Sequence, residues 1–565
     1  MAPRSWLESA TFSDDTTINF DSNDIVIFVG PNNAGKSVAL KNINEKAKDK
    51  NSLGVVIKDV TINSSGDEDE LITWLEKHCR KNIQNPSNPS FQRLGGNVHL
   101  SQAKSWWANP HDGLKELSGF FFYHLTTDAR LSAANPAPNI ALTRDPLTHP
   151  IHYMQVSGEI EIQLSTYFKE AFGEELIVHR NAGSEVPLHC GKRPVPGKDE
   201  DRVSLGYIQA LEKLPTLHTQ GDGMRSFVGV LLHSFVVNHS AVLIDEPEAF
   251  LHPPQARLLG RMLVEQAPAN RQMFVATHSG DFLRGILDTN TDRVRIIRIQ
   301  RDGDINLVTE LNNEGIKQVW GDPILRYSNI LDGLFHNQVI VCEADSDCRF
   351  YAAIKDVLYQ DAADETRRHL MFLHCGGKDR IPVVAKALRT LNVPTSVIAD
   401  FDVLSNEHPL KTIFLELGGD WDEIHSKWNL VKTSIDQKKP ELEAKEVIDE
   451  IGKLLSKIED KYFPKEAKKT IQTILRRSSP WAYAKTVGKS FIPSGDPTAA
   501  YNEMISHLKS KGLFVVEVGE LEGFSRSIGG HGPKWVNAAL EKDLFNDPEL
   551  EPAKTFVREF IELKR

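Results

Sequence analysis

Residues 30–37 (Gly-Pro-Asn-Asn-Ala-Gly-Lys-Ser) match the phosphate-binding pattern G-x-x-x-x-G-K-[ST]. Glycines at both ends let the backbone curl so that its N–H groups face phosphate oxygens. A lysine in this position reaches the β- and γ-phosphates, and the serine hydroxyl ligates Mg²⁺. The pattern therefore predicts an ATP site. The residues expected to contact ATP or its Mg²⁺ are Gly30, Asn32, Asn33, Ala34, Gly35, Lys36 and Ser37.

Three more polar residues follow short apolar runs. Asp245 and Glu246 come directly after residues 241–244, and His278 lies two positions after the run 273–276. We expect Asp245 to hold Mg²⁺ and Glu246 to polarise the attacking water, because adjacent carboxylates repel each other unless a cation is near. We expect His278 to hydrogen-bond the γ-phosphate.

A second acidic group lies in the C-terminal half. Glu343 follows an apolar run at 339–342, Asp347 lies one helical turn later, and Asp400 and Asp402 follow the apolar run 397–399. Carboxylate oxygens are the ligands that Mg²⁺ prefers. The four residues therefore predict a metal site, and two such metals would polarise a phosphodiester. The alternative is that they are surface carboxylates that cap the turns after the strands.

The apolar runs also predict the fold that positions these side chains. Short, fully apolar segments separated by helical segments are typical of a largely parallel sheet that is covered on both faces. A second alternation of strands and helices begins at residue 339, so we predict an α/β protein of two domains. The expected parts are an ATPase domain at 1–325 with an insertion at about 61–190 of unassigned role, a connector at 326–337, and an α/β domain at 338–565 with a helical insertion at about 405–510.

The bulk composition is that of globular, non-membrane material. Hydrophobic residues make up 40% of the chain and charged residues 25%, and the formal net charge is -11. A negative net charge does not indicate a DNA-coating surface, although local basic faces are enough for DNA contact. No signal peptide or apolar stretch of membrane-spanning length is found, and the five scattered cysteines do not form a zinc pattern. We therefore expect a cytoplasmic protein.

The order of the phosphate loop, Asp-Glu-Pro-Glu at 245–248 and Thr-His-Ser at 277–279 resembles the ABC ATPase superfamily. The resemblance implies a signature loop that covers ATP bound to a second subunit. Its best counterpart is the segment 220–226, with Gly221 and Gly223, although this segment departs from the usual Leu-Ser-Gly-Gly-Gln. The expected assembly is a homodimer or a higher homo-oligomer formed through the ATPase domains.

Glu343 followed by Asp400-Phe401-Asp402 resembles the Rossmann-like Toprim domain. The fused ABC-type ATPase narrows the resemblance to the OLD (overcoming lysogenization defect) family, which includes the Gabija nuclease subunit and retron-associated effectors. The resemblance implies Asp347 as an extra acidic ligand and Glu522, rather than Glu520, as a further metal ligand. It also implies that Lys534 neutralises charge in the transition state.

We therefore expect an ATP-regulated DNA endonuclease or nickase that depends on Mg²⁺ or Mn²⁺ and acts in bacterial anti-phage defence. The alternative is an ATPase switch whose Toprim domain binds nucleic acid or a partner without cutting. The sequence leaves open which DNA is cut, whether ATP activates or inhibits cleavage, and how many subunits assemble. It also leaves open whether a co-encoded partner, such as a helicase or a retron reverse transcriptase with its DNA, is required.

Overall fold

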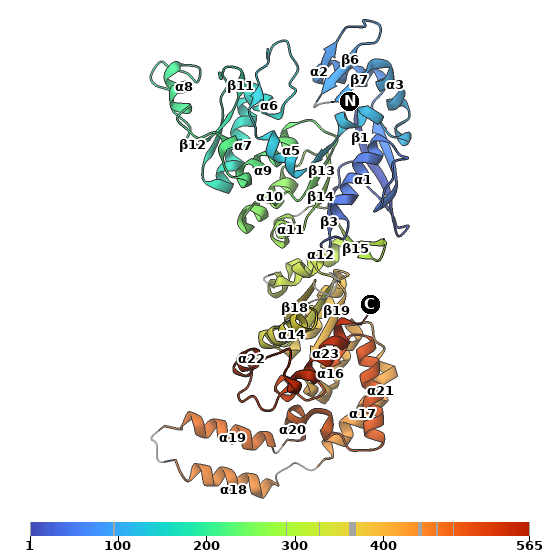
Figure 1. The fold of residues 1–565 in the computed structure, drawn as a ribbon, viewed down its shortest axis with the longest axis vertical. Helices are drawn as coiled ribbons and strands as arrows, with labels where there is room; N and C mark the ends of the chain where they lie inside the picture. The colour runs from blue at the N-terminus through green and yellow to red at the C-terminus, as the bar shows by residue number, and fades with distance from the viewer. Residues whose placement is uncertain are drawn as a thin grey trace. The chain divides into compact units, whose positions relative to one another are not determined.

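The computed structural model describes residues 2–563 except 94–95, 290, 327, 361–368, 439–442, 459–461 and 478. The chain forms two compact units, Met1–Lys317 and Gln318–Arg565 (Figure 1). This division lies before the predicted end of the ATPase domain at residue 325, and the described part of the predicted connector belongs to the second unit. Across the described residues, no helix has both the length and the apolar character needed to cross a membrane.

A six-stranded sheet with the order β16-β15-β3-β14-β13-β8 organises the first unit. Its strands are β3 (Ile25–Val29), β8 (Phe122–Leu125), β13 (Ala241–Asp245), β14 (Gln272–Ala276), β15 (Val294–Asp302) and β16 (Ile305–Glu310). All neighbours are parallel except the hairpin β15–β16. β3 and β14 are buried along their whole length, as expected of parallel strands covered on both faces.

The helices that follow these strands cover the sheet. α1 (Lys36–Lys48) packs on β8, β13 and β14, while α10 (Pro253–Glu265) packs closely on α11 (Gly280–Leu287). Two glycines allow this close packing: a Cβ on Gly260 would lie 2.3 Å from the Phe282 carbonyl oxygen. A Cβ on Gly285 would lie 1.9 Å from the carbonyl oxygen of Arg257. Because β3, β13 and β14 are parallel, the residues that follow them meet at one edge of the sheet.

The predicted insertion at 61–190 is not one insertion. β8 lies inside this range and pairs in parallel with β13, so it is the edge strand of the main sheet. Its four residues, Phe-Tyr-His-Leu, are too short and too polar to stand out as a buried strand. The elements before β8 in this range are β4 (Ile57–Ser65), α2 (Glu68–His78), β5 (Arg80–Asn82), β6 (Ser90–Arg93), β7 (Gly96–His99), α3 (Leu100–Ala108) and α4 (Ser118–Phe121). β4 pairs with β1 (Arg4–Phe12), and β1 also pairs with β2 (Thr17–Asn19), so these three strands form a separate sheet.

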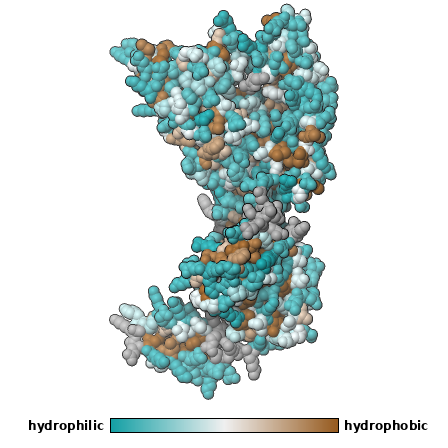
Figure 2. Space-filling model, in the orientation of Figure 1, coloured by the Kyte–Doolittle hydropathy of each residue, from teal (hydrophilic) through white to brown (hydrophobic). Residues whose placement is uncertain are grey.

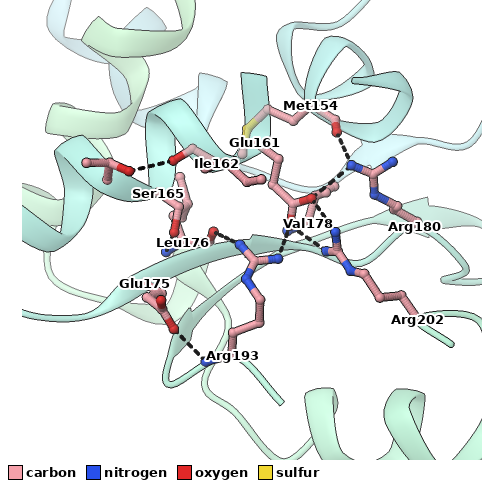
Figure 3. A network of polar contacts seen from close by, with 11 residues as sticks. Met154, Glu161, Ile162, Ser165, Glu175, Leu176, Val178, Arg180, Arg193 and Arg202 are labelled. Atoms are coloured by element: carbon pink, nitrogen blue, oxygen red, sulfur yellow. Dashed lines mark hydrogen bonds and ion pairs between the residues drawn. The ribbon is translucent and has the colours of Figure 1, made fainter. Parts of the chain in front are cut away.

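A largely helical part follows β8. It comprises α5 (Thr127–Ala133), β9 (Ala137–Pro138), α6 (Pro150–Val156), α7 (Gly158–Phe172), β10 (Glu175–Val178), β11 (Glu185–Val186), β12 (Leu188–Gly191), α8 (Leu205–Leu211) and α9 (Asp222–Leu231). Figure 3 shows its central ion-pair network, in which the fully buried Glu161 of α7 accepts hydrogen bonds from Arg180, Arg193 and Arg202. Burial alone would raise the pKa of Glu161, but the three guanidinium groups lower it to about 2. The network fixes the segment after β12 onto α7.

The second unit is built on a four-stranded, fully parallel sheet with the order β18-β17-β19-β20. Its strands are β17 (Gln338–Cys342), β18 (Leu370–His374), β19 (Thr395–Ala399) and β20 (Leu513–Val515). The helices α14 (Asp345–Leu358), α15 (Ile381–Thr390), α22 (Pro533–Leu540) and α23 (Glu551–Ile561) accompany the sheet, and α12 (Asn313–Gly321) and α13 (Pro323–Arg326) precede it. Within the predicted connector, the 3-10 helix Asn329–Phe335 leads into β17, with Ile330 and Leu334 buried.

The long connection between β19 and β20 is helical, as predicted for residues 405–510. It contains α16 (Glu407–Glu416), α17 (Trp421–Asp436), α18 (Ala444–Leu455), α19 (Lys465–Arg477), α20 (Pro480–Val487) and α21 (Asp496–Ser510). α17 and α21 lie side by side, and α18 pairs with α19 as an outlying hairpin (Figure 1). Figure 2 shows hydrophobic surface on this hairpin, where Ile448, Leu455 and Leu475 are exposed.

Candidate nucleotide and metal sites

The phosphate loop joins β3 to α1. Gly30 has a φ of +147°, and a Cβ there would lie 2.0 Å from the carbonyl oxygen of Ile299 on β15. Gly35 has a φ of +94° at the N-terminus of α1, and the Asn306 amide donates to the Ala34 carbonyl at 2.7 Å. Both glycine positions therefore require a residue without a side chain. Through these two contacts the phosphate loop packs against the β15–β16 hairpin.

Lys36 lies inside this loop. Its Nζ donates to the carbonyl oxygens of Gly30 and Pro31, each at 2.8 Å, and its side chain is buried. Burial lowers the pKa of Lys36 to about 8, against the opposing effect of Glu246, Glu248 and Asp245. The ammonium group is thus held at the phosphate loop, within the field of three carboxylates.

The residues at the carboxyl ends of β13 and β14 meet beside the loop. The Ser37 hydroxyl donates to Asp245 Oδ1 at 2.8 Å, so the two predicted Mg²⁺ ligands lie together. His278 Nδ1 lies 3.1 Å from Glu246 Oε1, and this contact lowers the pKa of Glu246 and raises that of His278. Burial raises the pKa of Asp245. The pair Ser37–Asp245 offers hard oxygen ligands, and the pair Glu246–His278 offers a carboxylate with an orienting partner.

Two further buried residues, which the sequence analysis did not select, contact the residues at this edge of the sheet. Glu248 accepts hydrogen bonds from the Thr277 hydroxyl at 2.7 Å and from the His278 amide at 3.1 Å, and burial raises its pKa. The fully buried Arg130 of α5 donates to the Asp245 carbonyl and to Ser226 Oγ of α9. Arg130 therefore ties the end of β13 to α9.

The predicted signature residues lie at the start of α9. Gly221 is the N-cap of this helix and is exposed, while Gly223 approaches the Phe250 carbonyl so closely that a Cβ would lie 2.7 Å from it. α9 packs on α5 and α7. The N-terminus of α9 is therefore presented at the surface of the first unit.

In the second unit the predicted acidic residues follow adjacent strands. Glu343 comes after β17, Asp400 and Asp402 come after β19, and these strands are neighbours. One carboxylate oxygen from each of the three residues lies within 4.8 Å of the other two. Burial, followed by the neighbouring Asp400, raises the pKa of Glu343 to about 7, and burial also raises the pKa of Asp400. Three carboxylates that crowd together in this way suit a divalent cation, which offsets their repulsion.

Asp347 belongs to the same acidic region. Its Oδ2 accepts from the Ala344 amide at 3.0 Å, so it also caps α14, and burial together with Asp400 and Glu522 raises its pKa to about 6. Glu520 and Glu522 follow β20, the neighbour of β19, and form a second cluster of possible metal ligands with His531. Glu522 Oε1 accepts from the Gly532 amide at 2.6 Å and contacts His531 Nδ1 at 2.6 Å. Glu520 and Glu522 thus lie in one cluster, together with His531, which the sequence analysis did not select, and the preference for Glu522 as the ligand stays a prediction.

Two lysines that the sequence reasoning did not select contact the acidic cluster. Lys485 Nζ lies 2.8 Å from Asp400 Oδ2, and Lys378 Nζ lies 3.0 Å from Asp402 Oδ2. Burial alone would lower the pKa of Lys485, but Asp400 and Asp402 raise it above its ordinary value. Lys534, the lysine selected from the sequence, is exposed in the first turn of α22, and its role stays a prediction.

Comparisons with known proteins agree with this architecture. Residues 210–284 match the family model described as AAA domain, putative AbiEii toxin, Type IV TA system. Residues 334–402 match the model described as overcoming lysogenization defect protein-like, TOPRIM domain. The chain therefore carries an AAA-type ATPase domain followed by an OLD-like Toprim domain.

Relatives and solved structures match over part of their length or at low similarity. The chain is 22% identical over 176 residues to the Old nuclease of Escherichia phage P2, covering 30% of this chain and 29% of that protein. It is 28% identical over 170 residues to the OLD nuclease of Thermus scotoductus, covering 29% of this chain and 31% of that protein. A solved Smc head bound to the C-winged helix domain of ScpA aligns at a TM-score of 0.34 and 12% identity, over 56% of this chain and 100% of that chain.

The matched regions thus span less than a third of each nuclease relative. The order of the two matched domains, an AAA-type ATPase domain before an OLD-like Toprim domain, agrees with the order that the sequence resemblance predicts.

Proposed function

We propose that this protein is an ATP-regulated, divalent-metal-dependent DNA endonuclease or nickase. The observation that carries the proposal is the convergence of Glu343, Asp400 and Asp402 at adjacent strand ends, with Asp347 in the same field. The donor set consists of hard carboxylate oxygens, which fit Mg²⁺ or Mn²⁺. A divalent metal bound there would polarise a phosphodiester and stabilise the leaving oxygen.

The residues of the first unit support ATP binding and hydrolysis. Lys36 and the backbone of residues 30–37 would hold the phosphates, and Ser37 and Asp245 would hold Mg²⁺. Glu246, oriented by His278, would position the attacking water. The exposed N-terminus of α9 with Gly221 and Gly223 supports a homodimer in which each signature loop meets the nucleotide of the other subunit.

The alternative is an ATPase switch whose Toprim domain binds nucleic acid or a partner without cutting. The full set of carboxylates at three adjacent strand ends favours the nuclease, because these carboxylates outnumber the two lysines that contact them and a divalent cation would offset the remaining repulsion. A role in anti-phage defence and a co-encoded partner belong to the same proposal and rest on the family resemblance alone. A cytoplasmic location is also part of the proposal, and it rests on the composition of the chain.

The test is cleavage of supercoiled and single-stranded DNA by the full chain with Mg²⁺ or Mn²⁺, with and without ATP. Glu343→Gln should abolish cleavage, because it removes a metal-binding charge at constant size. Glu517→Gln is the matched control, because Glu517 pairs with Lys489 and Lys509 outside the acidic cluster. Lys36→Ala should remove the ATP dependence while leaving the metal site intact.

The products separate the alternatives. Open circles would indicate a nickase, and linear products a double-strand endonuclease. Cleavage that persists in Glu343→Gln would show that the acidic cluster is not the nuclease site. ATP hydrolysis without cleavage under any of these conditions would favour the switch.

A further inference from the structure

Helix α20, which belongs to the insertion between β19 and β20, brings a lysine into the acidic cluster. Lys485 Nζ lies 2.8 Å from Asp400 Oδ2 and 3.4 Å from Asp402 Oδ1. The ammonium group therefore bridges the two carboxylates that follow β19. This is also where a divalent cation shared by these carboxylates would bind.

The backbone around Lys485 is held tightly in place. Gly488, just after α20, has a φ of +65°, and a Cβ there would lie 2.0 Å from the Glu517 carbonyl oxygen. Gly519 has a φ of +111°, and a Cβ there would lie 2.2 Å from the carbonyl oxygen of Lys485 itself. The Lys489 amide donates to the Glu517 carbonyl at 2.9 Å. Two glycines thus allow the end of α20 to press directly against the segment after β20.

The same segment is joined to the residues after β19. The Phe401 amide donates to the Gly519 carbonyl at 2.8 Å, and the rings of Phe401 and Trp481 of α20 are in contact, with their centroids 6.4 Å apart. α20 is therefore fixed to the segments after β19 and β20, two of the three strands that are followed by acidic residues. A lysine at position 485 can move its side chain but not its backbone.

A metal ion shared by Asp400 and Asp402 cannot occupy the position of the ammonium group. Lys485 would have to move aside, and its fixed backbone would keep the charge within several ångströms of the metal. A dication and an ammonium group about 5 Å apart repel each other enough, even at a water-like dielectric constant, to weaken metal binding about tenfold. The lysine thus holds the carboxylates together and also competes with the metal.

We propose that Lys485 is a positioning residue through which the helical insertion sets the metal concentration at which the Toprim site is loaded. The inference rests on the proposed function of the acidic cluster as a metal site. The inference gives a role to α20, a helix that is not required to connect the parallel strands β19 and β20. Lys378, which pairs only with Asp402 Oδ2 among the contacts described and is more exposed than Lys485, contributes less to this competition.

The test is Mn²⁺ binding to the full chain without nucleotide, measured by electron paramagnetic resonance, after subtraction of the signal that remains in Asp400→Asn. Lys485→Met should bind Mn²⁺ about tenfold more tightly than the wild type, and Lys485→Arg should bind as the wild type does. Lys489→Met is the matched control, because Lys489 lies one turn later and pairs with Glu517. Its Mn²⁺ affinity should not change.

Unchanged or weaker Mn²⁺ binding in Lys485→Met would overturn the inference. If Lys485→Met does not fold, Lys485→Gln serves instead, with the same expected direction. No Asp400-dependent Mn²⁺ signal in the wild type would instead overturn the metal site, and with it the proposed function. The two failures are therefore distinguishable.

Discussion

Arg130 is the residue whose replacement tests most directly how the nucleotide site is connected to α9. Its side chain is fully buried and donates to Ser226 Oγ at 3.1 Å, to Thr127 Oγ1 at 3.2 Å and to the Asp245 carbonyl. Arg130→Met keeps most of the volume but leaves these three acceptors without their donor. Unmaking hydrogen bonds to a buried charged group costs about 3–4 kcal/mol in total.

A loss of this size should lower the melting temperature of the first unit by about 8 °C, at roughly 2–3 °C per kcal/mol for a unit of this size. ATP turnover should fall at least about tenfold, which corresponds to ~1.4 kcal/mol in the activation barrier. The reason is that Asp245 and Ser226 lose their common anchor. ATP affinity should change less, because Arg130 contacts neither the phosphate loop nor Lys36 in the contacts described.

The matched control is Arg271→Met. Arg271 is also buried and donates to backbone carbonyls, among them those of Val237 and His239, but it precedes β14 at the opposite end of the strand from His278. Both variants should lose stability, and only Arg130→Met should lose turnover per folded molecule. Differential scanning calorimetry and a steady-state ATPase assay measure the two effects. Equal turnover in Arg130→Met and Arg271→Met at similar stability would refute the coupling.

Three further predictions concern the two sites. Mn²⁺ affinity of the acidic cluster, measured by titration, should rise about tenfold per pH unit between pH about 6 and pH about 7 and then level off, because the pKa of Glu343 is about 7, above the pKa of about 6 of Asp347, and its proton must leave before a metal binds. Glu343→Gln should flatten that slope; a slope that persists would assign the proton to another group. Glu246→Gln should slow ATP hydrolysis about 100-fold in single-turnover assays with little change in ATP binding, since water positioning is lost and phosphate contacts remain; equal losses of both would contradict this role. Gly488→Ala should destabilise the second unit by about 2 kcal/mol more than Gly495→Ala in denaturant titrations, because both glycines have positive φ but only Gly488 has a close backbone neighbour.

The strands and the residues that follow them could be predicted from the sequence because the signals are local. β3, β13 and β17 are short apolar runs that end at a glycine or a carboxylate, and a parallel strand buried on both faces has this pattern. Once the strands are parallel, their carboxyl ends share an edge, so the meeting of Glu343 with Asp400 follows from the order of the strands.

The residues that could not be predicted reach the sites from distant segments. Arg130 lies more than a hundred residues before Asp245, and Lys485 lies far beyond Asp400. Nothing in the composition around either residue distinguishes it from an exposed basic side chain on a helix. β8 was missed for a different reason, since a four-residue edge strand with two polar side chains carries no clear periodicity.

The position of the insertion explains why it can reach the acidic cluster. Two adjacent parallel strands need one crossover element, and α21, which packs on β20 and α17, is the helix that leads back into β20. The helices α16 to α20 are therefore additional to the sheet. They all follow the carboxyl end of β19, where Asp400 and Asp402 lie, so the added chain begins at the site itself. A helix added at this point needs only close backbone packing to place a side chain among the carboxylates, and Gly488 and Gly519 provide that packing for Lys485.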